Sequence, residues 1–247
     1  MKRLLRTALP LAFWLGVWQL AAGAVGQEFL LPGPATVGRR LLELAATVAF
    51  WETTFHSLVR VFGGLLAGAL AGTLLAGLSA VVPLLGWLFT PAVKVIRATP
   101  VASFILLVYL WVERGMVPGL ISALMVLPVL WGNVTKGIAE TDPQLLELAR
   151  AYGFGRGKTL GRIYIPSVMP YFASACRTAL GLAWKAGVAA EVLCQPKSAI
   201  GTQIFNTKYY LETPSLFAWT LMVIALSFLL EWAVGGLLKR LEGGRVG

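Results

Sequence analysis

Charge is scarce in this sequence. Charged residues make up only 13% of the 247 positions and hydrophobic residues 57%, whereas a soluble globular domain usually carries about 25% charged residues. Such a chain cannot cover a water-facing surface, which excludes a soluble protein. Since a helix needs about 20 mostly apolar residues to cross a bilayer, this length holds about five or six crossings. We therefore expect an all-α polytopic membrane protein in which residues 1–247 form one transmembrane domain.

Residues that build metal and catalytic sites are also scarce. His56 is the only histidine, and the two cysteines belong to no CxxC or Cys/His cluster, which excludes a zinc site. Cys176 and Cys194 are eighteen residues apart on one predicted helix, a separation of about 27 Å that excludes a disulfide. No HExxH motif, clustered acid pair or Ser/His constellation occurs, so we expect no enzyme, no cofactor and no metal. A GxxxxGK[ST] phosphate-binding loop is missing too, so any energy from ATP must come from another chain.

Six apolar segments can supply the crossings. The first follows a basic start and resembles a signal peptide, but its apolar stretch exceeds the usual length of about 7–15 residues and carries Trp14 and Trp18, so we interpret it as a retained span. An amphipathic segment at 35–50 is expected along the outer interface. The third segment is short for a crossing. The six segments are 9–25, 58–82, 99–112, 116–134, 168–192 and 215–238.

The second segment carries small residues at strict four-residue spacing. Gly64, Gly68 and Gly72 begin this series, and Ala76 and Ala80 continue it. Such a face has almost no side chain, so another helix can approach closely and pack by van der Waals contact. The series therefore predicts helix packing rather than a pore lining.

Positive charge predicts the orientation of the chain. The net charge is +10, but no compact basic surface interleaved with aromatic residues appears, so nucleic acid is not expected as a partner. Cytoplasmic loops of membrane proteins are rich in lysine and arginine. If both termini are cytoplasmic, thirteen cations, with Lys94 and Arg97 among them, fall in inner segments and five fall in outer segments. Six spans with both termini inside fit this bias.

The interval 135–166 is the longest polar stretch between two spans, and it contains a recognisable helix. Asp142 can cap the helix, Pro143 suits its first turn, and Gly153 stands where a left-handed residue ends a helix. An apolar stripe with helical spacing lies between these signals. Periodicity alone leaves open whether this amphipathic helix contacts a partner or rests on lipid headgroups. The residues of the stripe are Leu145, Leu148, Ala149 and Tyr152.

The same interval resembles the signature loop of permease subunits of binding-protein-dependent ABC importers, E-A-A-x3-G-x9-I-x-L-P. Glu147, Leu148 and Ala149 are followed by Gly153 and then, with the same spacing, by 163–166, which reads Ile-Tyr-Ile-Pro. Leu148 replaces the first alanine of the pattern and Ile165 its leucine. Segments 30–34, 98–100 and 183–191 also resemble permeases of the nitrate, sulfonate, taurine and bicarbonate importers, so the resemblance covers nearly the whole chain.

The resemblance implies partners and a function. It implies two permease subunits, which we expect to be copies of this chain, two cytoplasmic ATPases and an extracytoplasmic substrate-binding protein, all at the lipid bilayer of a bacterial plasma membrane. The loop would dock on the ATPase, and the solute would be a small anion such as a sulfonate, taurine, nitrate or bicarbonate. The residues carried over to this coupling role are Glu147, Leu148, Ala149, Gly153, Ile163 and Pro166.

The fifth span contains charged residues, which are costly inside a bilayer and should face protein or water. Lys185, and with it Arg177, could make a translocation path favourable to an anion, with Trp184 and Glu191 beside it. Alternatively, Lys185 pairs with an acid such as Glu191 or Glu231, and Arg177 reaches toward the cytoplasmic interface. The sequence leaves both interpretations open for Lys185.

An ion-coupled secondary transporter is the alternative function. Such a protein should show paired half-repeats and carboxylates near the middle of the membrane. The sequence shows no repeat, and Glu191 is its single candidate carboxylate near a core position. The importer subunit is therefore the leading hypothesis.

Overall fold

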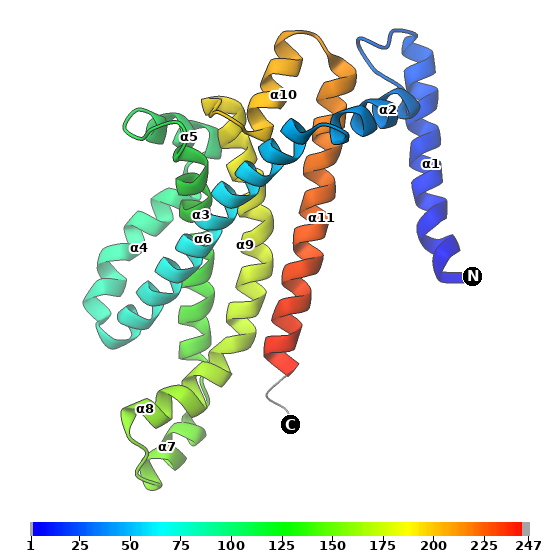
Figure 1. Ribbon diagram of the computed structural model, residues 1–247. Coiled ribbons are helices and arrows are strands. Elements are labelled where there is room, and N and C mark those ends of the chain that lie inside the picture. Colours follow the sequence, from blue (N-terminus) through cyan, green and yellow to red (C-terminus); the bar gives the residue numbers. More distant parts are fainter. Residues whose placement is uncertain (1, 244–247) are drawn as a thin grey trace.

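The computed structural model describes residues 2–243; Met1 and residues 244–247, which include Arg245 of the predicted basic tail, lie outside the described part. Within 2–243 every regular element is a helix, which confirms the expected all-α class (Figure 1). The elements are α1 (Lys2–Val25), α2 (Pro34–Ala45), α3 (Val48–Val81), α4 (Pro83–Ala98), α5 (Val101–Tyr109), α6 (Val117–Ala139), α7 (Pro143–Ala151), α8 (Arg156–Thr159), the π-helical turn η1 (Leu160–Tyr164), α9 (Ile165–Cys194), α10 (Ile200–Tyr209) and α11 (Thr213–Gly243).

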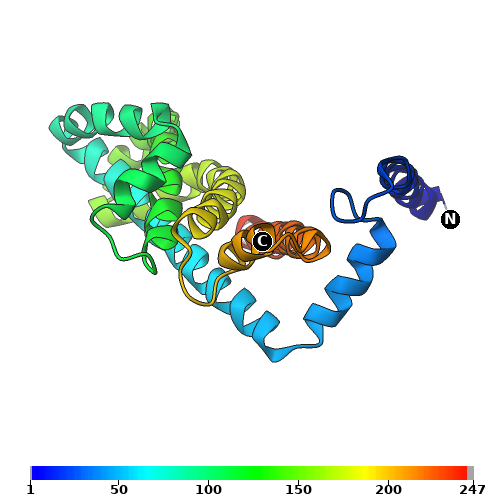
Figure 2. The same ribbon diagram turned by 90° about the horizontal axis from the view of Figure 1, so that it is seen from above.

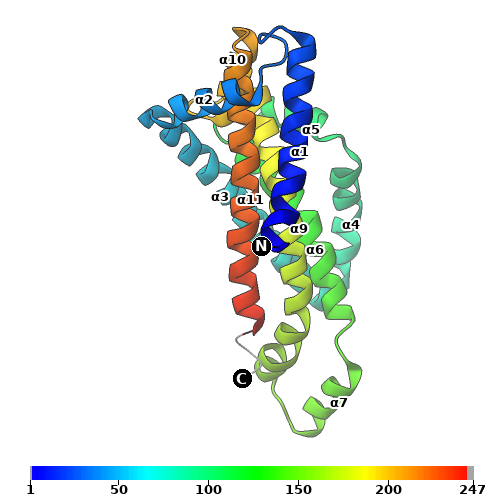
Figure 3. The same cartoon turned by 90° about the vertical axis from the view of Figure 1, so that its right-hand side faces the viewer.

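The long helices α3, α6, α9 and α11 form a bundle with two different ends. One end carries α7 and α8, which project beyond the bundle, and the other carries α5 and α10 (Figures 1 and 3). We call these the α7 end and the α10 end. The first helix, α1, stands apart from the bundle and is joined to it through α2 (Figure 2). Trp18 ties α1 to the rest, since its Nε1 donates to the Pro32 carbonyl at 3.0 Å and its ring stacks on Phe217.

Glycines place α3 directly against α6. A Cβ atom at Gly64 or Gly68 would overlap the α6 backbone at Gly119 or Ala123, and one at Gly72 would lie 2.6 Å from the Leu127 oxygen. Only residues without a side chain allow this approach. The opposite face of α3 is exposed and suited to lipid; it carries Leu66, Leu70, Leu74 and Leu78.

Within residues 2–243, three helices are long and apolar enough to cross a membrane on their own: α3, α6 and α11 over Thr213–Leu238. The pair α4 and α5 passes the same test together but is bent by 109° at Pro100. α1 contributes the shorter apolar run Leu9–Val25. α9 has 30 residues but carries Arg177, Lys185 and Glu191, which lower its hydropathy.

The third crossing differs from its prediction. The expected span at 99–112 is not one helix: α4 rises along the outside of the bundle, and α5 turns away after Pro100 (Figure 1). Proline disfavours helical backbone at the residue before it, here Thr99, and the Pro100 nitrogen has no N–H to continue the hydrogen-bond ladder. Lys94 and Arg97 therefore lie in the last turns of α4, within the height of the bundle. Counting them in an inner loop was wrong.

Three other boundaries also differ. α3 begins at Val48, inside the segment 35–50 that was expected to be one interfacial helix, because the chain breaks at Ala46 and Thr47. The interval between the last two spans contains a helix, α10, that the sequence pattern did not predict. Pro166 was expected to end the loop helix, yet α8, η1 and α9 run on as one helical path. Pro166 lies in the first turn of α9, where its missing N–H costs little.

Candidate functional site

The α7 helix is defined by its own caps. Asp142 accepts a hydrogen bond from the Gln144 amide at 2.8 Å, and Pro143 occupies the first turn. At the other end, Gly153 has φ +65°. The Gly153 amide donates to Arg150, and the Phe154 amide donates to Ala149. This pair of bonds is the Schellman motif, which requires a left-handed residue that glycine adopts without a Cβ penalty.

The α7 helix, which projects beyond the bundle, exposes apolar side chains (Figure 1). Leu145, Leu148 and Tyr152 are exposed at 43%, 54% and 74%. Glu147 is exposed on another side of the helix, about 100° around its axis from Leu148. Ala149 lies on the inner side and is buried. Exposed apolar side chains held beyond the end of the bundle are typical of a surface that contacts another protein.

The other residues of the signature lie on the path from the loop to the bundle. Ile163 is buried in η1, and Pro166 begins α9. The backbone is helical from Arg156 through Cys194, so the loop is joined to α9 without a break. A π-helical turn at this position is a place where such a helix can adjust its register.

The loop is also fastened at its two roots. Glu140 follows α6, and its carboxylate accepts a hydrogen bond from the Tyr171 hydroxyl of α9 at 2.5 Å. Lys136 lies 3.7 Å from the same carboxylate. The Tyr171 hydrogen bond, and secondly the charge of Lys136, lower the pKa of Glu140. This contact joins the helix that enters the loop to the helix that leaves it.

The charged residues of α9 have different surroundings. Lys185 is exposed on the single chain and forms no ion pair with an acid in the described part of the structure, so the expected alternative of pairing with Glu191 or Glu231 is not found. Arg177 is exposed two turns earlier. Trp184 is instead buried, with its Nε1 donating to the Val223 carbonyl of α11 at 3.1 Å. Glu191 is fully buried.

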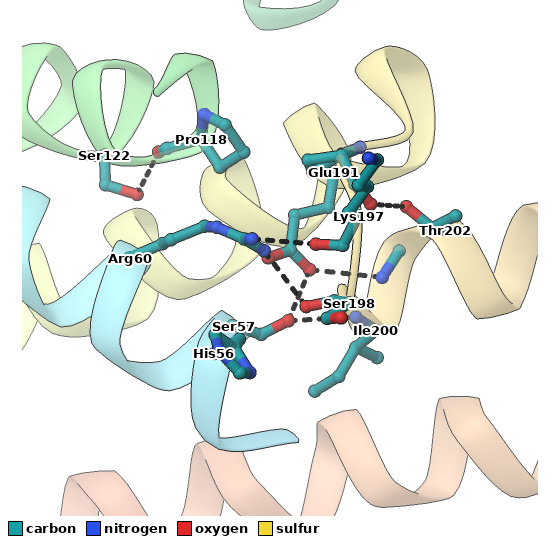
Figure 4. A network of polar contacts seen from close by, with 12 residues as sticks. His56, Ser57, Arg60, Pro118, Ser122, Glu191, Lys197, Ser198, Ile200 and Thr202 are labelled. Atoms are coloured by element: carbon teal, nitrogen blue, oxygen red, sulfur yellow. Dashed lines mark hydrogen bonds and ion pairs between the residues drawn. The ribbon is translucent and has the colours of Figure 1, made fainter. Parts of the chain in front are cut away.

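Glu191 belongs to a polar network at the α10 end (Figure 4). Its Oε2 accepts hydrogen bonds from Ser57 Oγ at 2.8 Å and from the Gly201 amide at 3.1 Å. Its Oε1 lies 3.8 Å from Arg60 Nη1. Arg60 also donates to the carbonyl oxygens of Ser198 and Lys197. The sequence placed Glu191 beside a translocation path, and the structure places it in the interior between α3, α9 and α10.

Sequence reasoning missed Arg97 as a residue of the bundle. Its Nη2 donates to the Pro128 carbonyl, midway along α6, at 2.5 Å. The guanidinium lies where a side chain on Gly132 would be. A signal was available, because Pro83 and Pro100 delimit sixteen residues that can form a helix, and this would have moved Arg97 out of a loop. Ser57 and Arg60 were missed as partners of Glu191, although Arg60 stands in an apolar span facing the same end.

Comparison with known proteins places the chain in a family. Residues 64–243 match the family described as the binding-protein-dependent transport system inner membrane component. The taurine transport system permease protein TauC of Escherichia coli is 23% identical over 95% of this chain and 86% of its own length. The riboflavin transport system permease protein RibX of Chloroflexus aurantiacus is 27% identical over 94% and 87%. The putative aliphatic sulfonates transport permease protein SsuC of Bacillus subtilis is 27% identical over 88% and 78%.

A solved structure supports the fold. The crystal structure of an amino acid ABC transporter with histidines covers 75% of this chain and 89% of its own chain, with a TM-score of 0.55 and 17% identity. These comparisons favour an ABC permease over an ion-coupled secondary transporter. Since the family match covers well over half of the residues, the chain belongs to the binding-protein-dependent transport system inner membrane components and is a membrane-spanning permease subunit, not an enzyme.

Proposed function

We propose that this chain forms, with a second copy of itself, the translocation path of an ABC importer for a small anion, and that α7 docks on the ATPase. Family membership implies association with an ATPase and a substrate-binding protein. The observation that carries the docking proposal is the capped helix α7, whose Leu145, Leu148 and Tyr152 are exposed beyond the bundle. The contact would use this stripe, with Glu147 exposed on another side of the same helix and with Ile163 and Pro166 on the helical path to α9.

The α7 end is proposed to face the cytoplasm, with both termini on the same side. Arg150, Arg156, Lys158 and Arg162 lie in or beside the loop. Even without Lys94 and Arg97, more lysines and arginines are assigned to the segments at this end than to those at the α10 end. Lysine and arginine in short loops mark the cytoplasmic side, and an ATPase is reached only from there.

The charges of the bundle support an anion and a second subunit. Lys185 and Arg97 are exposed on the single chain at heights where lipid would otherwise surround them, and a charged side chain inside a bilayer should face protein or water. A second copy of the chain against this face would enclose both cations in a shared path. Arg177 would extend that path toward the α7 end. The named relatives transport taurine, aliphatic sulfonates and riboflavin, which includes anions.

A matched pair of glycine variants tests the docking proposal. Gly153 and Gly155 both have open space around the position of an added Cβ, but Gly153 has φ +65° and Gly155 has φ −68°. Gly153→Leu should weaken co-purification of the ATPase by about tenfold or more, since a left-handed leucine costs over 1 kcal/mol and unwinds the end of α7. Gly155→Leu adds the same side chain without this cost and should leave co-purification within about twofold.

Membrane insertion should be the same for both variants, because the loop lies outside the spans. Glu147→Ala should lower solute-stimulated ATP hydrolysis with the ATPase still attached. Equal co-purification for Gly153→Leu and Gly155→Leu, together with normal transport for all three variants, would remove the assignment of α7 as the coupling element.

A further inference from the structure

The connection between α9 and α10 is the most constrained backbone of the bundle. Gln195 has φ 50° and Ser198 has φ 47°. Neither residue is a glycine, and the left-handed region is unfavourable for side chains with a Cβ. A backbone of this kind persists only where surrounding contacts determine it. We call residues 195–199 the elbow.

The contacts that hold the elbow come from α3. Arg60 donates through Nη2 to the Lys197 carbonyl at 2.7 Å and through Nη1 to the Ser198 carbonyl at 3.1 Å. Ser57 Oγ accepts the amide hydrogen of Ile200 at 2.9 Å and donates its own hydrogen to Glu191. One arginine and one serine thus bind two of the elbow carbonyls and the first amide of α10.

Glu191 joins these contacts to α9. The carboxylate is fully buried, and it also accepts the Gly201 amide of α10. Position 201 has room only for glycine, because a Cβ atom there would lie 2.4 Å from the backbone nitrogen of Val192. Three helices therefore meet at one carboxylate (Figure 4).

The contact among Ser57, Arg60 and Glu191 is polar, although apolar side chains could also hold these helices together. The closest Arg60 and Glu191 atoms are 3.8 Å apart, longer than a hydrogen bond. A buried ion pair with imperfect geometry repays little of its desolvation cost, and well-packed apolar residues often stabilise a core as well or better. The remainder of α10 packs on α9 and α11 rather than on α3, so loss of this junction would free α10 from α3 without unfolding the bundle.

We propose that Ser57, Arg60 and Glu191 form a latch that positions α10 on α3 and keeps the α10 end closed between transport events. The latch is separate from the coupling role of α7. It rests on the proposed function only because its test needs ATP turnover by the assembled importer. Breaking it would release the elbow and the first turn of α10 from α3, while α10 keeps its packing on α9 and α11.

A cysteine in the elbow reports the state of the latch. Ala199 is fully buried, and Ala199→Cys changes the side chain by one sulfur atom. The background would carry Cys176→Ala and Cys194→Ala, and the reconstituted complex would contain the ATPase and the binding protein. We expect the maleimide reaction of the cysteine at 199 to be slow at rest and faster during ATP turnover with loaded binding protein.

Three variants open the latch in different ways. Glu191→Gln keeps an acceptor for Ser57 and Gly201 but removes the charge beside Arg60. Ser57→Ala removes the bridge to Ile200, and Arg60→Lys keeps a charge but cannot span two carbonyls. Each should raise the resting reaction rate by about tenfold, since a hydrogen bond to a buried charged group shifts a two-state equilibrium by at least that factor.

Glu43→Gln is the matched control, because it removes an exposed ion pair with Arg40 near the same end. Its resting rate should equal that of the parent. If the three residues only stabilise the fold, all three latch variants should instead have a lower melting temperature and a lower yield. The cysteine reaction would then rise only in unfolded protein. Ser57→Ala and Arg60→Lys keep the carboxylate, so they test the proposal even where Glu191→Gln does not assemble.

Two results would overturn the latch: a parent rate that is the same at rest and during turnover, or resting rates for all three variants equal to that of Glu43→Gln. Failure of the α7 proposal is distinguishable. If Gly153→Leu leaves the ATPase bound while Glu191→Gln still raises the cysteine reaction, the coupling assignment is lost and the latch stands.

Discussion

The α7 end and the α10 end are held by different kinds of contact. At the α7 end a short helix is complete in itself, since Asp142 and Gly153 cap it, and it leaves Leu148 exposed for something outside the chain. At the α10 end, Glu191 of α9 is buried and depends on groups from two other helices, α3 and α10. The surface that we propose to bind a partner is built from local signals, whereas the network that we propose as a latch is built from residues far apart in the sequence.

Both ends depend on the contact between α3 and α6, and breaking this contact should have the largest effect. Gly68→Leu would drive a side chain into the α6 backbone at Ala123, which should destabilise the chain by about 3 kcal/mol or more and lower the yield of folded protein. Gly77→Leu lies on the same helix with open space at its Cβ and should fold normally. The check is size-exclusion yield and melting temperature in detergent. A Gly68→Leu protein that melts like Gly77→Leu would show that the close approach is dispensable.

The comparison of the two ends also explains what the sequence could predict. The caps of α7 and the signature spacing are local, so the loop helix was predicted to within a residue or two. Arg97 was misplaced although a local signal existed, because the prolines at 83 and 100 that delimit α4 were not used to place a helix there. The partners of Glu191 are more than 130 residues away at Ser57 and Arg60, and no local pattern records such a pairing. α10 was missed because its first two amides donate to Ser57 of α3 and Glu191 of α9 rather than to a capping residue.

If anions pass between the two ends of the bundle, the charge of Lys185 should affect their uptake. Lys185→Gln should raise the KM for uptake of a small anion by about tenfold, since removing one cation from a low-dielectric path costs about 1.4 kcal/mol. Uptake of nitrate and of taurine into proteoliposomes would be measured for the assembled complex. Lys208→Gln, which changes an exposed residue of α10, is the control. Unchanged KM values with both solutes would remove Lys185 from the path, although α7 could still couple.

The cap of α7 allows a graded test of its independence. Asp142→Ala removes the acceptor for Gln144 and should cost about 1 kcal/mol of helix stability, which corresponds to about fivefold weaker binding of the ATPase. Asp142→Asn keeps an acceptor and should bind within about twofold of the parent. Neither change should alter the reactivity of a cysteine at 199. If Asp142→Ala changes the resting reaction rate of the cysteine at 199, the two ends are not independent.

The smallest expected effect lies at the roots of the loop, where Tyr171 donates to Glu140. Tyr171→Phe removes the hydrogen bond that lowers the pKa of this carboxyl below its ordinary value of 4.5. A carboxylate with a lowered pKa stabilises the folded state above its unfolded pKa, and this stability is lost as the pH falls through the folded pKa. The melting temperature of the parent should therefore exceed that of Tyr171→Phe slightly at pH 7, and the two should converge below pH 4.5. Because Glu140 is exposed, screening by water keeps the difference small. A difference that is constant from neutral to acidic pH would mean that the phenol acts by packing, and that the α7 end is held without help from the Glu140 charge.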